Sequence, residues 1–182
     1  MLSDEQIIAR AVNGSHGDFR ELMRRHQAAV YRLSYRILKR HEEAEDAVQE
    51  TFLRVYQSLP SYSEQGRFWP WARRIAVNIC LKKLSPEIPS EETEELIDES
   101  SSWDDPVQNE AIRRAEMEQM RKAVSGLPST YRTVIVLRYE EELSYKEIAD
   151  MLGEPVATVQ VRLHRAKKML AERLGVMNNE LL

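Results

Sequence analysis

Apolar residues recur at the three- and four-residue spacing of amphipathic helices along most of the chain. This spacing predicts a helix from Asp18 to Lys39 and a second one over residues 42–60, which Pro60 ends. Another helix is expected from Phe68 to Leu84. Pro70 is compatible with it, because it falls in the first turn, where proline is tolerated. The apolar positions that define the first two helices are Phe19, Leu22, Met23, Val30, Leu33, Ile37, Leu38, Ala44, Val48, Phe52 and Val55.

A shorter helix is expected at the N-terminus. Ser3 is followed three residues later by Gln6, which is the pattern of a capping box, and Gly14 suits the end of that helix. Residues 61–66 have the composition of a loop.

The second half of the chain is also expected to be helical. One helix ends near Val124, and Gly126 and Pro128 mark a break after it. Residues 134–139, with the sequence VIVLRY, have the propensity of a β-strand, but no partner strand is visible, so a helix is favoured. The predicted fold is therefore all-α.

Between the two helical blocks lies an acidic stretch, residues 85–110, with three prolines, five serines and no basic residue. Its few apolar residues cannot offset the entropy of ordering it, so it is interpreted as a linker between a domain at 1–84 and a domain at 111–182. The total charge of −4 hides this division: the three parts carry +4, −10 and +2 in chain order. Partners are better inferred from the parts than from the total.

Length and composition narrow the class of protein. A chain of 182 residues fits one large domain or two small ones. It has no apolar run long enough to cross a membrane, and its N-terminus lacks the features of a secretory signal. The single cysteine, Cys80, cannot form an internal disulfide. A cytoplasmic protein is the simplest expectation.

Residues 143–174 carry the most specific local pattern. Ser144 and Glu147 form a second capping-box pattern, and Leu143 and Ile148 occupy the positions of a hydrophobic staple. Gly153 suits a left-handed turn, and a new helix is expected to start at the proline that follows two residues later. A short helix, a tight turn and a longer helix predict a helix-turn-helix.

The second helix of this motif separates into two faces. Its expected buried stripe is Val156, Val159, Leu163, Ala166 and Leu170. The other side bears cations and no acid until Glu172, which is the kind of surface that the major groove accepts. The residues expected to contact DNA there are Thr158, Gln160, Val161, Arg162, His164, Arg165 and Lys168. Of these, Lys168 is expected to meet phosphate, together with Lys167 and Arg173.

Three segments together resemble one family. LPSTYRTVIVLRYEEELSYKEIADMLGEPVATVQVRLHRAKKML is similar to region 4 of bacterial sigma factors of the extracytoplasmic-function (ECF) group. AEDAVQETFLRVYQSL and FWPWARRIAVNICLKKL resemble region 2 of the same family. The chain departs from it in having Gln160 and Val161 where many relatives have a basic residue and serine, and Glu142 where glycine is usual.

This resemblance implies a dissociable initiation subunit of RNA polymerase. The histidines and the cysteine are scattered without metal-ligand spacing, and no phosphate-binding glycine loop is present, so no cofactor, metal or enzymatic activity is expected. The N-terminal domain would bind the β′ clamp helices and open the minus-ten element, and the C-terminal domain would bind the minus-thirty-five element and the β flap. It also implies an anti-sigma factor, often anchored in the membrane, while the chain itself would not insert. The polymerase-binding residues would be Asp46, Gln49, Glu50, Phe52 and Arg54, and the minus-ten residues Tyr62, Trp69, Arg73, Arg74, Asn78 and Lys82.

Some alternatives remain open from the sequence. Phe68 and Trp71 fall on a core stripe, whereas Trp69 is either packing or a stacking platform. The acidic linker is either a plain tether or an electrostatic substitute for RNA in the polymerase exit path. Cys80 is either buried packing or a redox sensor. A helix-turn-helix regulator that works without polymerase would explain the C-terminal motif but not residues 45–84.

Overall fold

The structure, a computed structural model, describes residues 2–62, 68–84 and 108–175. Across these residues every regular element is a helix, which confirms the all-α prediction. The elements are α1 (Asp4–Val12), α2 (His16–Leu38), α3 (His41–Ser58), η1 (Leu59–Ser61), α4 (Phe68–Leu84), α5 (Gln108–Ser125), α6 (Ser129–Ile135), η2 (Val136–Glu140), α7 (Tyr145–Leu152) and α8 (Val156–Leu174).

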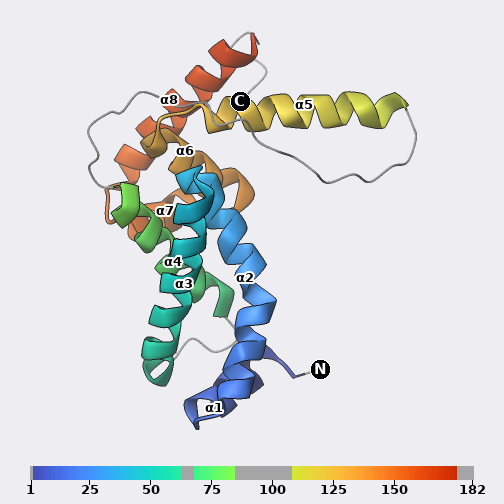
Figure 1. The fold of residues 1–182 in the computed structure, drawn as a ribbon. Coiled ribbons are helices and arrows are strands. Elements are labelled where there is room, and N and C mark those ends of the chain that lie inside the picture. Colours follow the sequence, from blue (N-terminus) through green and yellow to red (C-terminus); the bar gives the residue numbers. More distant parts are fainter. Residues whose placement is uncertain (1, 63–67, 85–107, 176–182) are drawn as a thin grey trace.

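The first four helices form the N-terminal half, in which α2 packs against α1, α3 and α4 (Figure 1). The capping box of α1 is present: the Gln6 amide donates to Ser3 Oγ, and the Ser3 amide donates to Gln6 Oε1. Most of the predicted apolar positions of α2 and α3 are buried, with Phe19, Met23 and Val48 only half-buried. The helix predicted at 68–84 has the expected bounds.

The C-terminal half contains α5 to α8, with α8 packed against α5, α6 and α7. The VIVLRY segment is helical, since α6 continues directly into a π-helical turn at η2, so the strand alternative is wrong. Figure 1 shows that α5 extends outward from this half. It begins at Gln108, inside the stretch interpreted as linker, while residues 85–107 lie outside the described part of the chain.

The two halves touch each other. One buried apolar cluster includes residues of α2, α3 and α4 together with residues of α6, α7 and α8. Helix α2 contacts α6 and η2, and α4 contacts α7. In Figure 1 the C-terminal half lies at one end of the α2–α4 bundle, opposite α1. The domain boundaries predicted from the sequence stay a prediction, but the described parts of the two halves are packed together.

Candidate nucleic-acid interfaces

The helix-turn-helix is formed by α7 and α8. The Glu147 amide donates to Ser144 Oγ at 3.2 Å, and the Ser144 amide donates to Glu147 Oε2 at 2.8 Å, so the predicted capping box is complete. The Ser144 hydroxyl also donates to Glu147 Oε2 at 2.6 Å, and this hydrogen bond, followed by that of the Ser144 amide, lowers the pKa of the Glu147 carboxyl. Gly153 ends α7 in the left-handed region at φ 67°, and Pro155 lies just before α8.

Packing fixes the orientation of α8. Leu143 and Ile148, the predicted staple, are both buried. Four of the five residues predicted for the inner stripe of α8 are buried, but the prediction for Val156 is wrong. Val156 is the first residue of α8 and is 39% exposed. The opposite face of α8 is therefore turned to solvent.

The residues predicted to contact DNA on that outer face are either exposed or already held by a contact within the chain. Gln160, Val161, His164, Arg165 and Lys168 are exposed. Thr158 is half-buried, and Arg162 donates its Nη1 to Glu154 at 2.7 Å. To bind a DNA group through Nη1, Arg162 therefore has to give up its ion pair with Glu154, whereas Arg165 has no such ion pair to break.

The turn that enters the helix-turn-helix keeps a glycine-like geometry without glycine. Glu142 has φ 55°, in the left-handed region that side chains other than glycine rarely adopt. The backbone path into Leu143 is held by the Leu143 amide, which donates to the Leu137 carbonyl at 3.1 Å. Glutamate at this position therefore holds a strained left-handed conformation that glycine would adopt freely.

A second polar stripe runs along α4. Arg74, Asn78 and Lys82 are spaced by four residues and are all exposed, so they share one face of the helix. Arg73 differs: it is buried, and its Nη1 donates to Glu141 Oε2 at 3.1 Å and to the Glu141 carbonyl at 3.3 Å. The minus-ten set predicted from the sequence thus contains three accessible residues of α4 and one that the C-terminal half covers.

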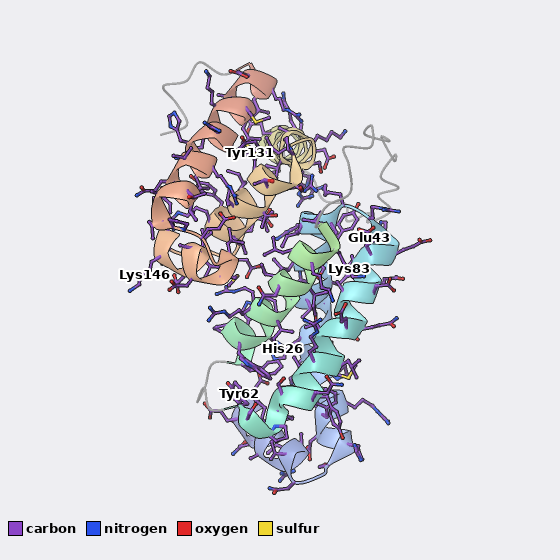
Figure 2. All side chains as sticks on the ribbon, turned by 90° about the vertical axis from the view of Figure 1, so that its left-hand side faces the viewer. His26, Glu43, Tyr62, Lys83, Tyr131 and Lys146 are labelled. Carbon is purple, nitrogen blue, oxygen red and sulfur yellow. The ribbon has the colours of Figure 1, made fainter. Side chains whose placement is uncertain are left out.

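The aromatic residues before and within α4 pack on one another. Phe68 is buried, as predicted, and Trp71 is only half-buried, with its ring 4.8 Å from that of Tyr62. Trp69 is also half-buried and lies stacked on His26 at 6.4 Å. Figure 2 shows His26 and Tyr62 near the end of α4 that lies away from the C-terminal half. The ring of Trp69 therefore has a packing role, whatever else it contacts; residues 63–66 of the expected loop lie outside the described part.

The predicted polymerase-binding residues lie on α3, but not all face outward. Asp46 and Gln49 are exposed, and Arg54 donates to Glu50 at 2.6 Å. Phe52 is only 2% exposed and belongs to the core, so its side chain is not available to a partner in this structure.

Sequence reasoning missed Leu53, which is 57% exposed. It follows Asp46, Gln49 and Glu50 at helical spacing and gives their face an apolar centre. A leucine at a solvent-facing heptad position was the available signal. Lys83 of α4, which Figure 2 shows near Glu43, reaches Asp46 at 3.7 Å and borders the same surface.

Cys80 is buried in the shared apolar cluster, and burial raises the pKa of its thiol to about 11. The thiol stays protonated at neutral pH, which favours packing over redox sensing. Among the described residues, no group of three or more potential ligands could hold a metal ion. In the same part of the chain, no helix combines the length and the hydropathy needed to cross a membrane.

Comparison with known proteins agrees with this geometry. The family descriptions "Sigma-70 region 2" and "Sigma-70, region 4" match residues 22–85 and 117–170. The chain is 34% identical over 176 residues to the ECF RNA polymerase sigma factor SigW of Bacillus subtilis, covering 92% of this chain and 94% of SigW. It is 30% identical over 183 residues to the ECF RNA polymerase sigma-E factor of Haemophilus influenzae, covering 95% and 96%.

Among solved structures, the fold is similar to that of the sigma factor RpoE from Bartonella quintana, determined in complex with the anti-sigma factor NepR. The TM-score is 0.60 at 20% identity, over 87% of this chain and 98% of that one. The two family matches place the helical halves of this chain in the sigma-70 class of transcription initiation factors. The chain belongs to the ECF group of the sigma-70 family. It is a DNA-recognition factor and not an enzyme.

Proposed function

We propose that this chain works through three separate surfaces when it directs promoter-specific initiation by core RNA polymerase. The outer face of α8 reads the minus-thirty-five element, the α4 stripe captures the minus-ten strand, and the outer face of α3 binds the polymerase. The observation that carries the proposal is the helix-turn-helix, whose packing leaves Gln160, His164, Arg165 and Lys168 free of the core.

Each surface suits its assigned ligand chemically. Arginine contacts guanine edges, glutamine contacts adenine and an exposed valine can pack on a thymine methyl group, so Gln160, Val161 and Arg165 form the set that reads the bases. On α4, Asn78 stands between two cations, which suits a flipped base held by its backbone phosphates. On α3, acidic and amide groups surround exposed Leu53, a common arrangement for a protein interface.

The decisive experiment uses purified bacterial core RNA polymerase and a promoter selected in vitro with the reconstituted holoenzyme. A sigma factor gives specific transcripts only with core, and the chain alone does not retain the promoter. A helix-turn-helix regulator that acts without polymerase binds the promoter alone. Specific retention without core, together with no transcript when core is present, would replace the proposal with this second function.

The polymerase surface can be tested separately with Leu53→Ser. Removing the apolar centre of the α3 face is expected to weaken core binding by about 1–3 kcal/mol, or roughly 5- to 150-fold in Kd. The matched control is Val12→Ser, which makes the same kind of change at an exposed apolar residue of α1. Equal core affinity for the two variants would remove α3 as the polymerase surface.

Two further parts of the proposal concern regulation and place. An anti-sigma factor is proposed as a partner, supported by the complex of the Bartonella RpoE with NepR. A cytoplasmic location follows from the need to meet polymerase and DNA; a membrane-anchored anti-sigma factor would hold the chain at the membrane.

The acidic stretch is tested by neutralising Glu91, Glu92, Glu94 and Glu95. Altered abortive transcripts favour a role as an RNA substitute, and unchanged transcripts favour a plain tether.

A further inference from the structure

The turn of the helix-turn-helix carries a glutamate that has no role in the proposed function. Glu154 lies between Gly153, which ends α7, and Pro155, which precedes α8. It forms an ion pair with Arg162, whose Nη1 lies 2.7 Å from Glu154 Oε2. Arg162 is one of the residues expected to contact DNA, so this carboxylate bears directly on the DNA-binding face.

The ion pair sets the direction of the Arg162 side chain. Arg162 lies in the second turn of α8, and its guanidinium reaches back to a residue that precedes the helix. Side chains of a helix lean toward its N-terminus, so this direction is an ordinary one. In a helix-turn-helix, the N-terminal residues of the second helix contact the base edges. Glu154 therefore holds the guanidinium beside the end of α8 that faces the bases.

The pair is also shielded from solvent. The side chains of Arg162 and Glu154 are only 27% and 29% exposed, and the Oε2 atom of Glu154 is buried. A buried carboxylate oxygen that loses its cation is destabilising, because its charge is then left without a partner. The ion pair is therefore expected to persist when α8 binds DNA.

We propose that Glu154 is a positioning residue that makes Arg162 the reader of one guanine in the minus-thirty-five element. The inference rests on the proposed function, since it places α8 in the major groove. A guanidinium has five N–H donors, and the carboxylate pairs with its Nη1 end. The edge formed by Nε and Nη2 is left for a bidentate contact with O6 and N7 of guanine. Held in this way, Arg162 is kept from the phosphates, whose contacts add affinity but no sequence information.

The experiment scans the minus-thirty-five element base by base with reconstituted holoenzyme. The duplex is the one selected in vitro with the wild type, each base pair is replaced in turn, and the Kd is measured. Arg162→Ala identifies the base pair that Arg162 reads, where replacement should weaken wild-type binding by about 5- to 150-fold. In Glu154→Gln the penalty should fall below about 3-fold at that base pair alone, because the freed arginine no longer keeps its orientation.

Salt dependence gives a second readout. A freed Arg162 should neutralise one more phosphate, and each phosphate contact adds about 0.9 to the slope of log K against log salt. On a duplex with the element scrambled, the slope should therefore be steeper in Glu154→Gln than in the wild type by about that amount. The matched control is Glu172→Gln, which removes one negative charge from an exposed residue of the same helix. It should keep the wild-type slope and the wild-type pattern of base discrimination.

A double variant shows whether Glu154 acts through the arginine. Glu154→Gln combined with Arg162→Ala should discriminate bases like Arg162→Ala alone, because the two groups are partners in one interaction. Circular dichroism confirms folding; if Glu154→Gln does not fold, Glu154→Asp takes its place, since it keeps the charge but draws the carboxylate away from Arg162. An unchanged penalty at the Arg162 base pair, an equal drop at every base pair, or the same change in Glu172→Gln would overturn the positioning role.

This outcome is distinguishable from failure of the proposed function. If the chain reads a duplex without core polymerase and gives no transcript with it, the sigma-factor role fails, and the same scan is run on the chain alone. The penalty at the Arg162 base pair then still decides the role of Glu154. Absence of sequence-selective duplex binding, with and without core, would overturn both.

Discussion

Helices α8 and α4 both carry cations that the sequence assigns to DNA, yet the structure holds them in different states. On α8, Arg165 and Lys168 are exposed, and the helix-turn-helix turns them to solvent. On α4, Arg73 is buried against Glu141, and Arg74 is bonded to the Asp150 carbonyl. The cations of the first surface are exposed, whereas α4 has an exposed face with Arg74, Asn78 and Lys82 beside a face whose Arg73 the C-terminal half covers.

The difference arises from what each helix packs against. The inner stripe of α8 packs against α5, α6 and α7 of its own half, and in the described part of the chain the carboxylate paired with its outer face is that of Glu154, on Arg162. The α4 helix lies where the halves meet, so the face next to its polar stripe becomes part of an internal interface. A cation's residue type fixes what it can bind, and its neighbours decide when it is available.

The largest effect is expected for Arg132→Ala. This change removes the guanidinium that donates to carbonyls of Ile37, Ser125 and Leu127, so several buried acceptors lose their charged donor. We expect a loss of about 3 kcal/mol in the free energy of unfolding, measured in urea. The single transition of two packed halves should also split into two, because their shared contact is weakened.

The control for that prediction is Lys122→Ala, which removes an exposed cation of α5 paired only with Glu118 at 3.6 Å. It should change the stability by less than about 0.5 kcal/mol. A loss of similar size in both variants would mean that Arg132 acts through general charge and not through the interface.

Arg165→Ala tests the accessible surface. Losing one arginine from the base-reading face is expected to weaken holoenzyme binding to the minus-thirty-five duplex by about 1–3 kcal/mol. Binding to a single-stranded minus-ten oligonucleotide should not change. A loss of equal size on both DNA probes would contradict the separation of the two surfaces.

Much of this organisation follows from the sequence, and the exceptions have physical causes. The helix bounds, both capping boxes and the inner stripe of α8 depend on local spacing, so they could be predicted. Val156 was expected in the core because its spacing fits the inner stripe, but spacing alone does not show that the first residue of α8 is left exposed. Phe52 matched a motif for polymerase binding, but its direction toward the core depends on how α3 packs in the folded bundle.

Contacts between distant segments were beyond sequence reasoning altogether. Arg73 and Glu141 are 68 residues apart, and Arg132 and Ile37 are 95 apart. No local period connects such pairs, and the acidic stretch between the halves suggested a loose connection. The same limit applies to Trp69, whose stacking on His26 depends on a helix more than 40 residues earlier.

Asn78→Ala and Trp69→Ala distinguish chemistry from packing on α4. Asn78 is exposed, so its truncation should leave the stability within about 0.5 kcal/mol of wild type and impair promoter opening. Trp69 is half-buried on His26, so its truncation should cost about 1–3 kcal/mol of stability, below the range for a fully buried tryptophan. Thermal unfolding measures the change in stability, and permanganate footprinting measures promoter opening. If Trp69→Ala impairs promoter opening without lowering the stability, Trp69 is a stacking platform for a base.

The smallest effect is expected for Ser144→Ala, which removes the cap that positions the helix-turn-helix. We expect a loss of about 1 kcal/mol at pH 7 and weaker binding to the minus-thirty-five duplex. Because hydrogen bonds from Ser144 lower the pKa of Glu147 below its ordinary 4.5, their contribution is present above that pH and is lost as the pH falls through the lowered value. The stability difference from wild type should therefore narrow in acid. The control is Ser3→Ala, which removes the equivalent cap from α1 and should lower the stability by a similar amount without changing duplex binding. A loss of duplex binding in both variants would show that binding depends on overall stability and not on the cap of the helix-turn-helix.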